Sequence, residues 1–219
     1  LNAWFMRWPA IDARHPTGRI HVPPTLLETP LAAWHVAHGG RMVDFAGWRM
    51  PVQYASIVDE HLATRRAAGM FDVSHMGRLA VRGRDAVAWL ESLLTRRVAD
   101  IDVGRVRYTL VTSDAVAPPV VLDDALVSRE ADAADGSPRL ALVVNASNRE
   151  RVVAWLSSRL PRAGVSFEDR TFATGMIAVQ GPSAQQGGSL SAQTPGVSRL
   201  LQSAVHGQTN APTHGRPPQ

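Results

Sequence analysis

The order of strand-like and helix-like segments after residue 76 constrains the fold more than any other feature of this chain. Residues 77–82 alternate between apolar and polar side chains, as a half-buried strand does. Residues 84–94 then place valine and leucine at helical spacing. The remaining predicted elements are strands over residues 106–112, 120–127, 140–145 and 176–180 and a helix over residues 147–160. Two helices that can cover one sheet face predict an α+β fold with mostly antiparallel sheets and covering helices.

The segment before residue 77 predicts shorter elements with clear ends. A short helix is expected within residues 29–40, ended by a glycine pair, and a strand over residues 41–45. Ser56 is expected to cap a helix that ends at Gly69. In the same way, Ser147 with Glu150 predicts a capping box at the start of the last helix.

The two terminal segments differ from the rest in composition. Residues 1–28 contain several prolines and no sustained period, so we expect an irregular extension. Residues 183–219 are dominated by Ser, Gln, Gly, Pro and Thr, and we expect a largely disordered tail.

Charge and composition argue against several classes of protein. The formal charge is +4, but all 23 basic residues are arginines, scattered and interleaved with acidic residues. Nucleic-acid binding is therefore not expected, because phosphate recognition needs clustered charge. No apolar run reaches membrane-spanning length and no signal peptide is evident, so the prediction is a cytoplasmic protein without membrane contact. The lack of cysteine excludes thiolate sites and disulfides.

Asp123 and Asp124, after the apolar residues 120–122, are the best candidates for a general acid or base. Adjacent residues of a strand face opposite sides, so only one of the two can point into a pocket. The spacing alone leaves an alternative open, since an acidic pair that closes a strand is more often a solvated turn.

Other candidate sites have weaker support. His35 and His38 lie three apart on a short helix, but no third ligand is evident, so we interpret them as solvent-facing or locally bonded and predict no metal site. We interpret His75 as a satisfied structural histidine. Met76 and Tyr108 could line a pocket for a flat aromatic ligand or could belong to the core. No Rossmann, P-loop or nucleophile-elbow motif is present.

A series of motifs in one order resembles the aminomethyltransferase family, the T-protein of the glycine cleavage system. The motifs are residues 41–54, 69–77, 107–109, 122–124, 143–146 and 178–182. The resemblance runs from residue 29 to residue 182 and covers the N-terminal portion of a family member.

The resemblance implies a fold, an activity and a set of site residues. It implies a discontinuous folate-binding domain, residues 29–76 plus 164–182, with a second α+β domain, residues 77–163, inserted in it. Such proteins transfer an aminomethyl carbon from the lipoylated H-protein to tetrahydrofolate and release ammonia. Asp124 would be the catalytic carboxylate that holds and polarises the attacking folate nitrogen. The residues implied to contact the pterin and its linker are Met76, Tyr108, Leu126, Val144 and Asn145.

Several differences from the family pattern keep alternatives open. Pro118 and Pro119 stand where a glycine pair is usual, and Ser128 stands where an aromatic residue is common. The family's β-rich C-terminal domain is not recognisable after Pro182, so we expect it to be absent and the chain to be truncated. The alternatives are a non-catalytic folate-binding module, an inactive fragment, or a folate-dependent demethylase.

Overall fold

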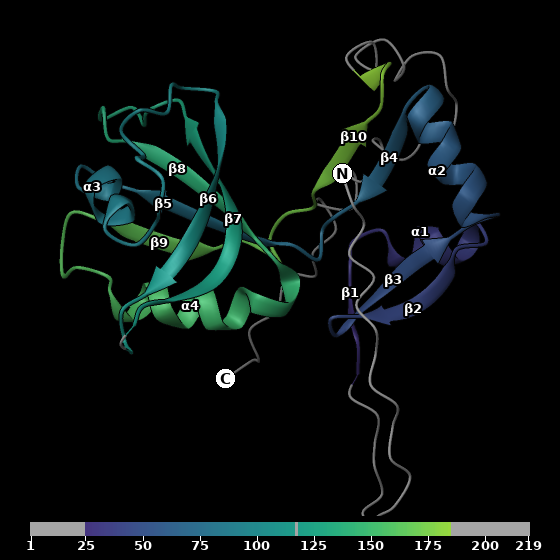
Figure 1. Cartoon of the computed structure of the whole chain (residues 1–219), viewed down its shortest axis with the longest axis horizontal. Helices are drawn as coiled ribbons and strands as arrows, with labels where there is room; N and C mark the ends of the chain where they lie inside the picture. The colour runs from purple at the N-terminus through teal and green to yellow at the C-terminus, as the bar shows by residue number, and fades with distance from the viewer. Residues whose placement is uncertain (1–24, 117, 185–219) are drawn as a thin grey trace, which may run out of the picture.

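The computed structural model describes residues 25–116 and 118–184, which form two lobes (Figure 1). Most of the predicted extension and tail, residues 1–24 and 185–219, lies outside the described residues. The first lobe contains β1 (Leu27–Glu28), α1 (Ala32–Ala37), β2 (Arg41–Phe45), β3 (Trp48–Gln53), α2 (Ile57–Arg66), β4 (Gly69–Asp72) and β10 (Ile177–Gln180). The second lobe contains β5 (Gly77–Arg82), α3 (Ala86–Glu91), β6 (Val106–Ser113), β7 (Val120–Glu130), β8 (Arg139–Val144), the 3₁₀ turn η1 (Ala146–Asn148), α4 (Arg149–Ser158) and β9 (Ser166–Asp169).

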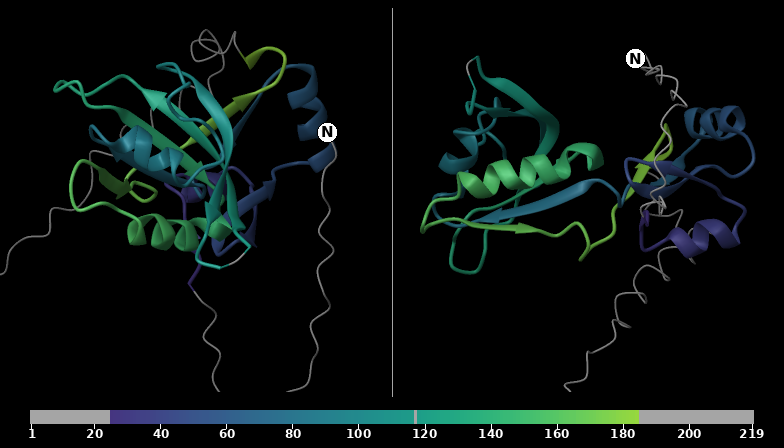
Figure 2. Two further views of the ribbon diagram at one scale, coloured as in Figure 1. Left: turned by 60° about the vertical axis from the view of Figure 1, so that its left-hand side comes forward. Right: turned by 90° about the horizontal axis from the view of Figure 1, so that it is seen from below.

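The second lobe is a five-stranded antiparallel sheet with two helices on one face (Figure 2). The strand order is β6-β7-β8-β5-β9. Leu90 of α3 and Leu156 of α4 are fully buried in the same core as Val81 of β5 and Leu142 of β8. Burial of every second strand residue therefore provides the surface on which both helices pack. The prediction of an α+β fold with antiparallel sheets and covering helices is confirmed.

Gly77 lets β5 approach α4 closely at the start of this sheet. A Cβ atom at residue 77 would lie 2.5 Å from Cγ2 of Val144 and 3.1 Å from Cγ of Arg149. Any larger residue would force β5 away from β8 and α4. The glycine therefore determines how closely the chain packs just after Met76.

The first lobe contains two small sheets. In the three-stranded sheet β1-β3-β2, β1 pairs with Trp48 and Arg49 of β3 only. Pro51 lies further along β3, beyond the residues that pair with β1, so its missing N–H leaves no β1 acceptor unpaired. The second sheet joins β4 to β10 in antiparallel pairing, although the whole second lobe lies between them in sequence. The chain therefore leaves the first lobe after β4 and returns to it with β10 (Figure 1).

Arg78 ties together the two chain segments that connect the lobes. Its guanidinium donates to the carbonyl oxygens of Ser74 at 2.8 Å and Met76 at 2.7 Å in the outgoing segment. In the returning segment it donates to both oxygens of Thr174, at 2.6 and 2.9 Å, and to the carbonyl of Thr171. One side chain thus satisfies backbone acceptors from both crossings.

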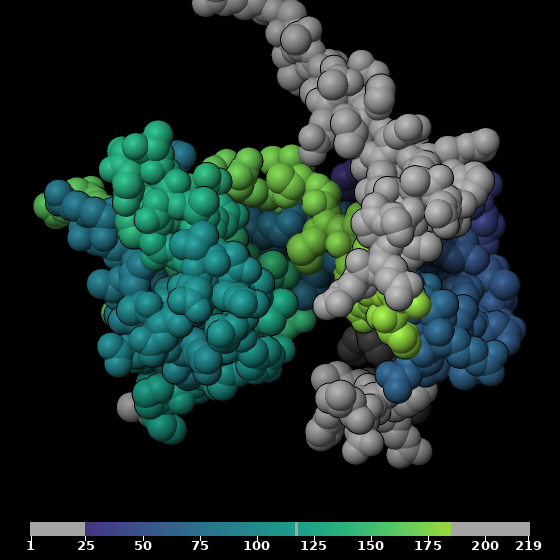
Figure 3. All heavy atoms as spheres, turned by 90° about the horizontal axis from the view of Figure 1, so that it is seen from above, coloured from purple at the N-terminus to yellow at the C-terminus, as the bar shows by residue number. Residues whose placement is uncertain are grey.

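The segment that connects the two lobes is visible in green between them in Figure 3. An aromatic contact at Phe172 further stabilises this junction. The ring of Phe172 stacks on Trp48 of β3, with centroids 5.7 Å apart. The guanidinium of Arg149, from α4, lies 4.6 Å from the centroid of the same ring. Phe172 therefore contacts side chains from both lobes.

Several local predictions are confirmed and others are wrong. Ser56 caps α2, since its hydroxyl accepts from the backbone N–H of Asp59 at 3.3 Å. The capping box at Ser147 is wrong, because η1 occupies residues 146–148 and α4 begins at Arg149 without a side-chain cap. Strands β1, β3, β4 and β9 were not predicted, and β1 lies at the end of the segment 1–28 that was expected to be irregular. The helix predicted over residues 84–94 is limited to α3.

The helices of the described ranges are also too short or too polar for a membrane. Within residues 25–116 and 118–184, none combines the length and apolarity that crossing a bilayer requires.

Candidate functional site

Asp123 and Asp124 are neighbours on β7 and point to opposite faces of the second-lobe sheet. Asp123 lies on the same face as the buried Ala125 and Val127, and it is only 3 % exposed. Asp124 lies on the open face and is exposed. The prediction that the two side chains face opposite sides of the strand is confirmed. The alternative of a solvated turn is wrong, since β7 continues to Glu130.

Asp123 is held by amide groups from the end of β8 and from η1. Its Oδ2 accepts the backbone N–H of Asn145 at 2.8 Å. Its Oδ1 accepts the side-chain amide of Asn145 at 2.9 Å and that of Asn148 at 2.6 Å. These donors offset the cost of burying a carboxylate.

Asp124 is held from both sides on the open face of the sheet. Its Oδ1 accepts the side-chain amide of Asn145 at 2.8 Å, and its Oδ2 accepts the hydroxyl of Tyr108 at 3.0 Å. The hydrogen bond to Asp124 is the main cause that raises the pKa of Tyr108, with desolvation and the charges of Asp124 and Asp123 adding to it. We call Tyr108, Asp123, Asp124, Asn145 and Asn148 the acid–amide cluster.

The sheet register brings further predicted residues to this cluster. Leu126 pairs with Tyr108 and is 43 % exposed on the open face. Met76 directly precedes Gly77, which pairs with Val144 at the end of β8, so Met76 lies beside Asn145 at the same end of the sheet. Val144 differs from the others, because its side chain is fully buried in the core on the opposite face. Only its backbone lies close to the cluster.

Asn148 is the member of the cluster that the sequence analysis missed. The sequence predicted a capping box at Ser147 and Glu150, which flank this residue. In the structure, the side chain of Asn148 instead binds Asp123 of β7. The inward position of Asp123 carried a signal in the sequence, since it has the same parity along β7 as Ala125 and Val127. No pattern in the sequence indicated that Asn148 would bind this buried carboxylate.

A second buried carboxylate lies in the first lobe. Asp72 accepts from the hydroxyl of Thr29 at 2.6 Å, from Nε2 of His35 at 3.0 Å and from the backbone N–H of Ser74 at 2.9 Å. Nδ1 of His35 in turn lies 2.5 Å from the hydroxyl of Tyr54. We call Thr29, His35, Tyr54, Asp72 and Ser74 the His35–Asp72 network. It joins α1 to β4 and to the chain that follows β3.

The His35–Asp72 network shifts two pKa values. Burial alone would raise the pKa of Asp72, but the hydrogen bonds from His35, Ser74 and Thr29 outweigh it and lower the pKa to about 2. Burial, together with the charges of Asp72 and Glu60, raises the pKa of Tyr54 to about 12. Asp72 is therefore ionised and Tyr54 protonated at neutral pH.

The remaining histidine predictions have mixed outcomes. His38 is locally bonded as expected, with Nδ1 2.8 Å from the carbonyl of Trp34, whereas His35 is buried and bonded to residues distant in sequence. His75 is not a satisfied histidine. The residue is 9 % exposed, its ring packs edge-on against Phe45, and its Nδ1 has no partner in the described part of the chain. Burial lowers the pKa of His75, which favours the neutral ring.

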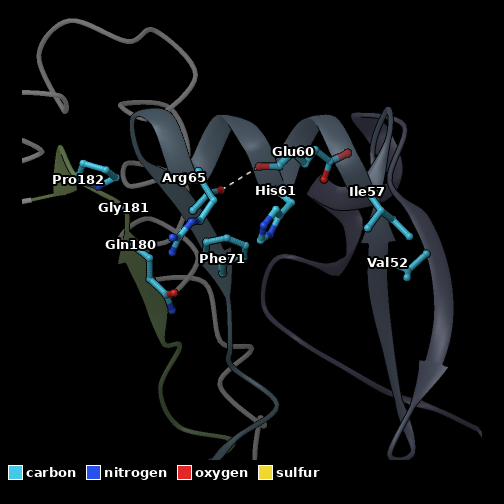
Figure 4. Close-up of a pocket in the computed structure, with 10 residues that line it drawn as sticks. Val52, Ile57, Glu60, His61, Arg65, Phe71, Gln180, Gly181 and Pro182 are labelled. Carbon is cyan, nitrogen blue, oxygen red and sulfur yellow. Dashed lines mark hydrogen bonds between the residues drawn. The ribbon is translucent and has the colours of Figure 1, made fainter. Parts of the chain in front are cut away.

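A separate cavity of about 670 Å³ lies on the first lobe between α2 and the β4–β10 sheet (Figure 4). His61 and Arg65 of α2 and Phe71 of β4 line one part of it, next to Gln180 at the end of β10. The other lining residues are Val52, Ile57, Glu60, Thr64, Gly181 and Pro182. None of the predicted site residues lines this cavity, so it is distinct from the acid–amide cluster.

Comparison with known proteins places this arrangement in one family. A family model described as the GCVT N-terminal domain matches residues 31–192. The aminomethyltransferase of Geobacillus thermodenitrificans is 41 % identical over 161 residues, which are 74 % of this chain and 42 % of the relative. That of Chlorobaculum tepidum is 42 % identical over 156 residues, 71 % of this chain and 40 % of the relative.

A solved structure agrees with the sequence relatives. The glycine cleavage system aminomethyltransferase T from Bartonella henselae matches with a TM-score of 0.67 and 33 % identity, covering 78 % of this chain and 44 % of that one. The chain thus spans about two fifths of the length of the curated relatives it matches.

Proposed function

Because the chain belongs to the GCVT N-terminal domain family, we propose that it acts as the tetrahydrofolate-binding part of an aminomethyltransferase of the glycine cleavage system. The observation that carries this proposal is the exposed carboxylate of Asp124, held between Tyr108 and Asn145 on the open face of the sheet. A carboxylate fixed by two donors keeps its orientation while its free lone pairs can accept an N–H of a ligand.

The residues of the cluster suit a flat ligand with polar edges. Tyr108 is 59 % exposed and Leu126 is 43 % exposed on the same face as Asp124, which offers aromatic and apolar surface beside a hydrogen-bonding group. Asn145 and the backbone at Val144 close one side, and Met76 lies beside them. Tetrahydrofolate, when bound, would supply the ring nitrogen that takes up the transferred carbon.

The role of Asp124 in the proposed reaction is to orient that nitrogen. Its carboxylate would accept a hydrogen bond from the nitrogen and polarise it toward the carbon. Val144 would contact the ligand through its backbone alone, since its side chain is buried in the core. The lipoylated H-protein would be the donor of the aminomethyl group, with ammonia as the second product.

The domain organisation also belongs to this proposal. Residues 29–76 plus 164–182 would form a discontinuous folate-binding domain, and residues 77–163 the inserted domain. The pairing of β4 with β10 supports this division, because it joins the beginning and the end of the matched region in one sheet. Ser128 is half-buried on the open face of β7. The proposed folate site would therefore be wider at this position than it would be with an aromatic side chain there.

Calorimetric titration with tetrahydrofolate tests the proposal. We expect binding by the wild-type chain and a loss of affinity of about tenfold or more in Asp124→Asn, because one hydrogen bond to a charged group is removed. Asp135→Asn, at an exposed carboxylate of the β7–β8 loop, should bind as the wild type does. Absence of binding by the wild-type chain, or equal binding by all three, would contradict the proposal. Turnover with aminomethyl-loaded H-protein then separates a transferase from a non-catalytic folate-binding module.

A further inference from the structure

Asp123 is a buried carboxylate that the proposed carbon transfer does not use directly. At 3 % exposure it lies on the core side of β7, where no ligand on the open face can touch it. Its three hydrogen bonds all come from two asparagines, and one of these, Asn145, also binds Asp124. The buried acid and the exposed acid are therefore connected through a single amide group.

We propose that Asp123 and Asn148 are positioning residues, which fix the Asn145 amide so that it presents the Asp124 carboxylate to the ligand. The catalytic meaning of this assignment rests on the proposed function. The positioning itself is a property of the free protein, because all of its hydrogen bonds exist without a ligand.

The chemistry of the groups determines the direction of every hydrogen bond in the cluster. Arg151 only donates, and its guanidinium lies 3.0 Å from Oδ1 of Asn148. The amide nitrogen of Asn148 must then face the other way, toward Asp123 at 2.6 Å. Oδ1 of Asp123 accepts the side-chain amide of Asn145 at 2.9 Å, so the nitrogen of that amide faces Asp123.

The orientation of the Asn145 side-chain amide then determines which of its atoms faces the Asp124 carboxylate. With its nitrogen toward both acids, the amide donates to Oδ1 of Asp124 at 2.8 Å and to its carbonyl oxygen at 3.1 Å. A flipped amide would place an oxygen against the carboxylate oxygens of both acids, which would repel it. The backbone N–H of Asn145, bound to Asp123 at 2.8 Å, fixes the residue at its other end. Asp123 therefore determines which group of the Asn145 amide faces Asp124, and Asn148, oriented by Arg151, holds Asp123 in place.

The hydroxyl of Tyr108 reports on this arrangement without any ligand. Its hydrogen bond to Asp124 raises its pKa. The chain contains only two tyrosines, so Tyr54→Phe leaves Tyr108 as the one phenol that an ultraviolet pH titration detects. If Asp124 leaves its position, the pKa of Tyr108 falls toward that of an ordinary tyrosine.

The experiment compares variants in this Tyr54→Phe background. In Asp123→Asn, an NH₂ group replaces one carboxylate oxygen and faces either the backbone N–H of Asn145 or the two side-chain amides, so at least one donor lacks an acceptor. We expect the pKa of Tyr108 to fall in Asp123→Asn and Asn148→Ala, in the same direction as in Asp124→Asn. The matched control is Ser147→Ala, at an exposed position of η1, and it should titrate as the parent does.

Two further measurements separate positioning from a general loss of structure. Far-ultraviolet circular dichroism and thermal melting show which variants fold. If Asp123→Asn does not fold, Asn148→Ala tests the positioning role instead, because Asn148 is only half-buried. Titration of the folded variants with tetrahydrofolate should show affinity reduced about tenfold. An unchanged Tyr108 titration in both variants, with a changed one in Asp124→Asn, would overturn the proposal. Failure of the parent chain to bind tetrahydrofolate would instead contradict the proposed function and leave the Tyr108 result to decide positioning.

Discussion

The two lobes each bury one carboxylate and surround it with hydrogen-bond donors, but the two hydrogen-bond networks end differently. Asp72 and its donors form a set that joins α1 to β4, and its outermost member, Tyr54, is bonded inward to His35. Asp123 and its amides lead outward to Asp124, which is exposed on an open sheet face. A buried charge with several hydrogen bonds is therefore not by itself evidence of a site. What distinguishes the second lobe is that its network ends at an exposed carboxylate, that of Asp124, whereas the network of the first lobe ends at the phenol of Tyr54, which is bonded inward.

Asp72→Ala tests the structural half of this comparison and should have the largest effect. The substitution leaves the ring of His35, the hydroxyl of Thr29 and the N–H of Ser74 without their common acceptor. We expect the free energy of unfolding to fall by about 3 kcal/mol or more, measured by urea denaturation. Asp59→Ala, at an exposed position in the first turn of α2, should cost less than about 1 kcal/mol. Equal losses in the two variants would remove the distinction between them.

The second prediction concerns the free energy of unfolding at acid pH, where a smaller change is expected. The pKa of Asp72 falls from its ordinary value of 3.8 to about 2 in the folded state. Because the folded-state value is the lower one, this stabilisation is complete above the ordinary pKa and is lost as the pH falls through about 2. We expect a loss of about 2 kcal/mol over this range, measured as denaturation midpoints against pH. Asp72→Asn should lack this part of the pH dependence, and a wild-type profile in that variant would contradict the assignment.

Asp124→Ala should have the smallest effect on stability. The side chain is exposed, so its removal takes away hydrogen bonds that water can replace. We expect the free energy of unfolding to change by about 0.5 kcal/mol or less, measured by the same urea denaturation. A loss as large as that of Asp72→Ala would mean that Asp124 is part of the structural framework and would break the comparison between the lobes.

The sequence predicted elements where the residues themselves carry the information. β2 and β5 have the predicted bounds, because alternation and flanking glycines mark them. β4 and β9 are four-residue strands whose pairing partners lie far away in sequence, so no local pattern distinguishes them from loops. β3 contains Pro51, which argues against a central strand unless the partner strand is known to be short.

The site was predictable to a similar degree. The pair of acids and the opposite directions of their side chains follow from the pleat of a strand. The bonds from Asn145 and Asn148 do not, because they depend on how the end of β8 and η1 are placed against β7. The capping box failed for the same reason, since the segment before α4 adopts a 3₁₀ turn in which the Asn148 side chain binds Asp123.

The return of the chain from the second lobe to the first has a consequence for biosynthesis. Ser74 and Met176, which bind each other at the junction, are 102 residues apart, and β10 follows directly after Met176. At typical translation rates, β4 leaves the ribosome roughly 5 to 20 s before the strand that completes its sheet. All strands of the second lobe are contained between these two points, so the whole lobe is synthesised within that interval. The first lobe is thus synthesised first but is the last to be completed, because it needs β10.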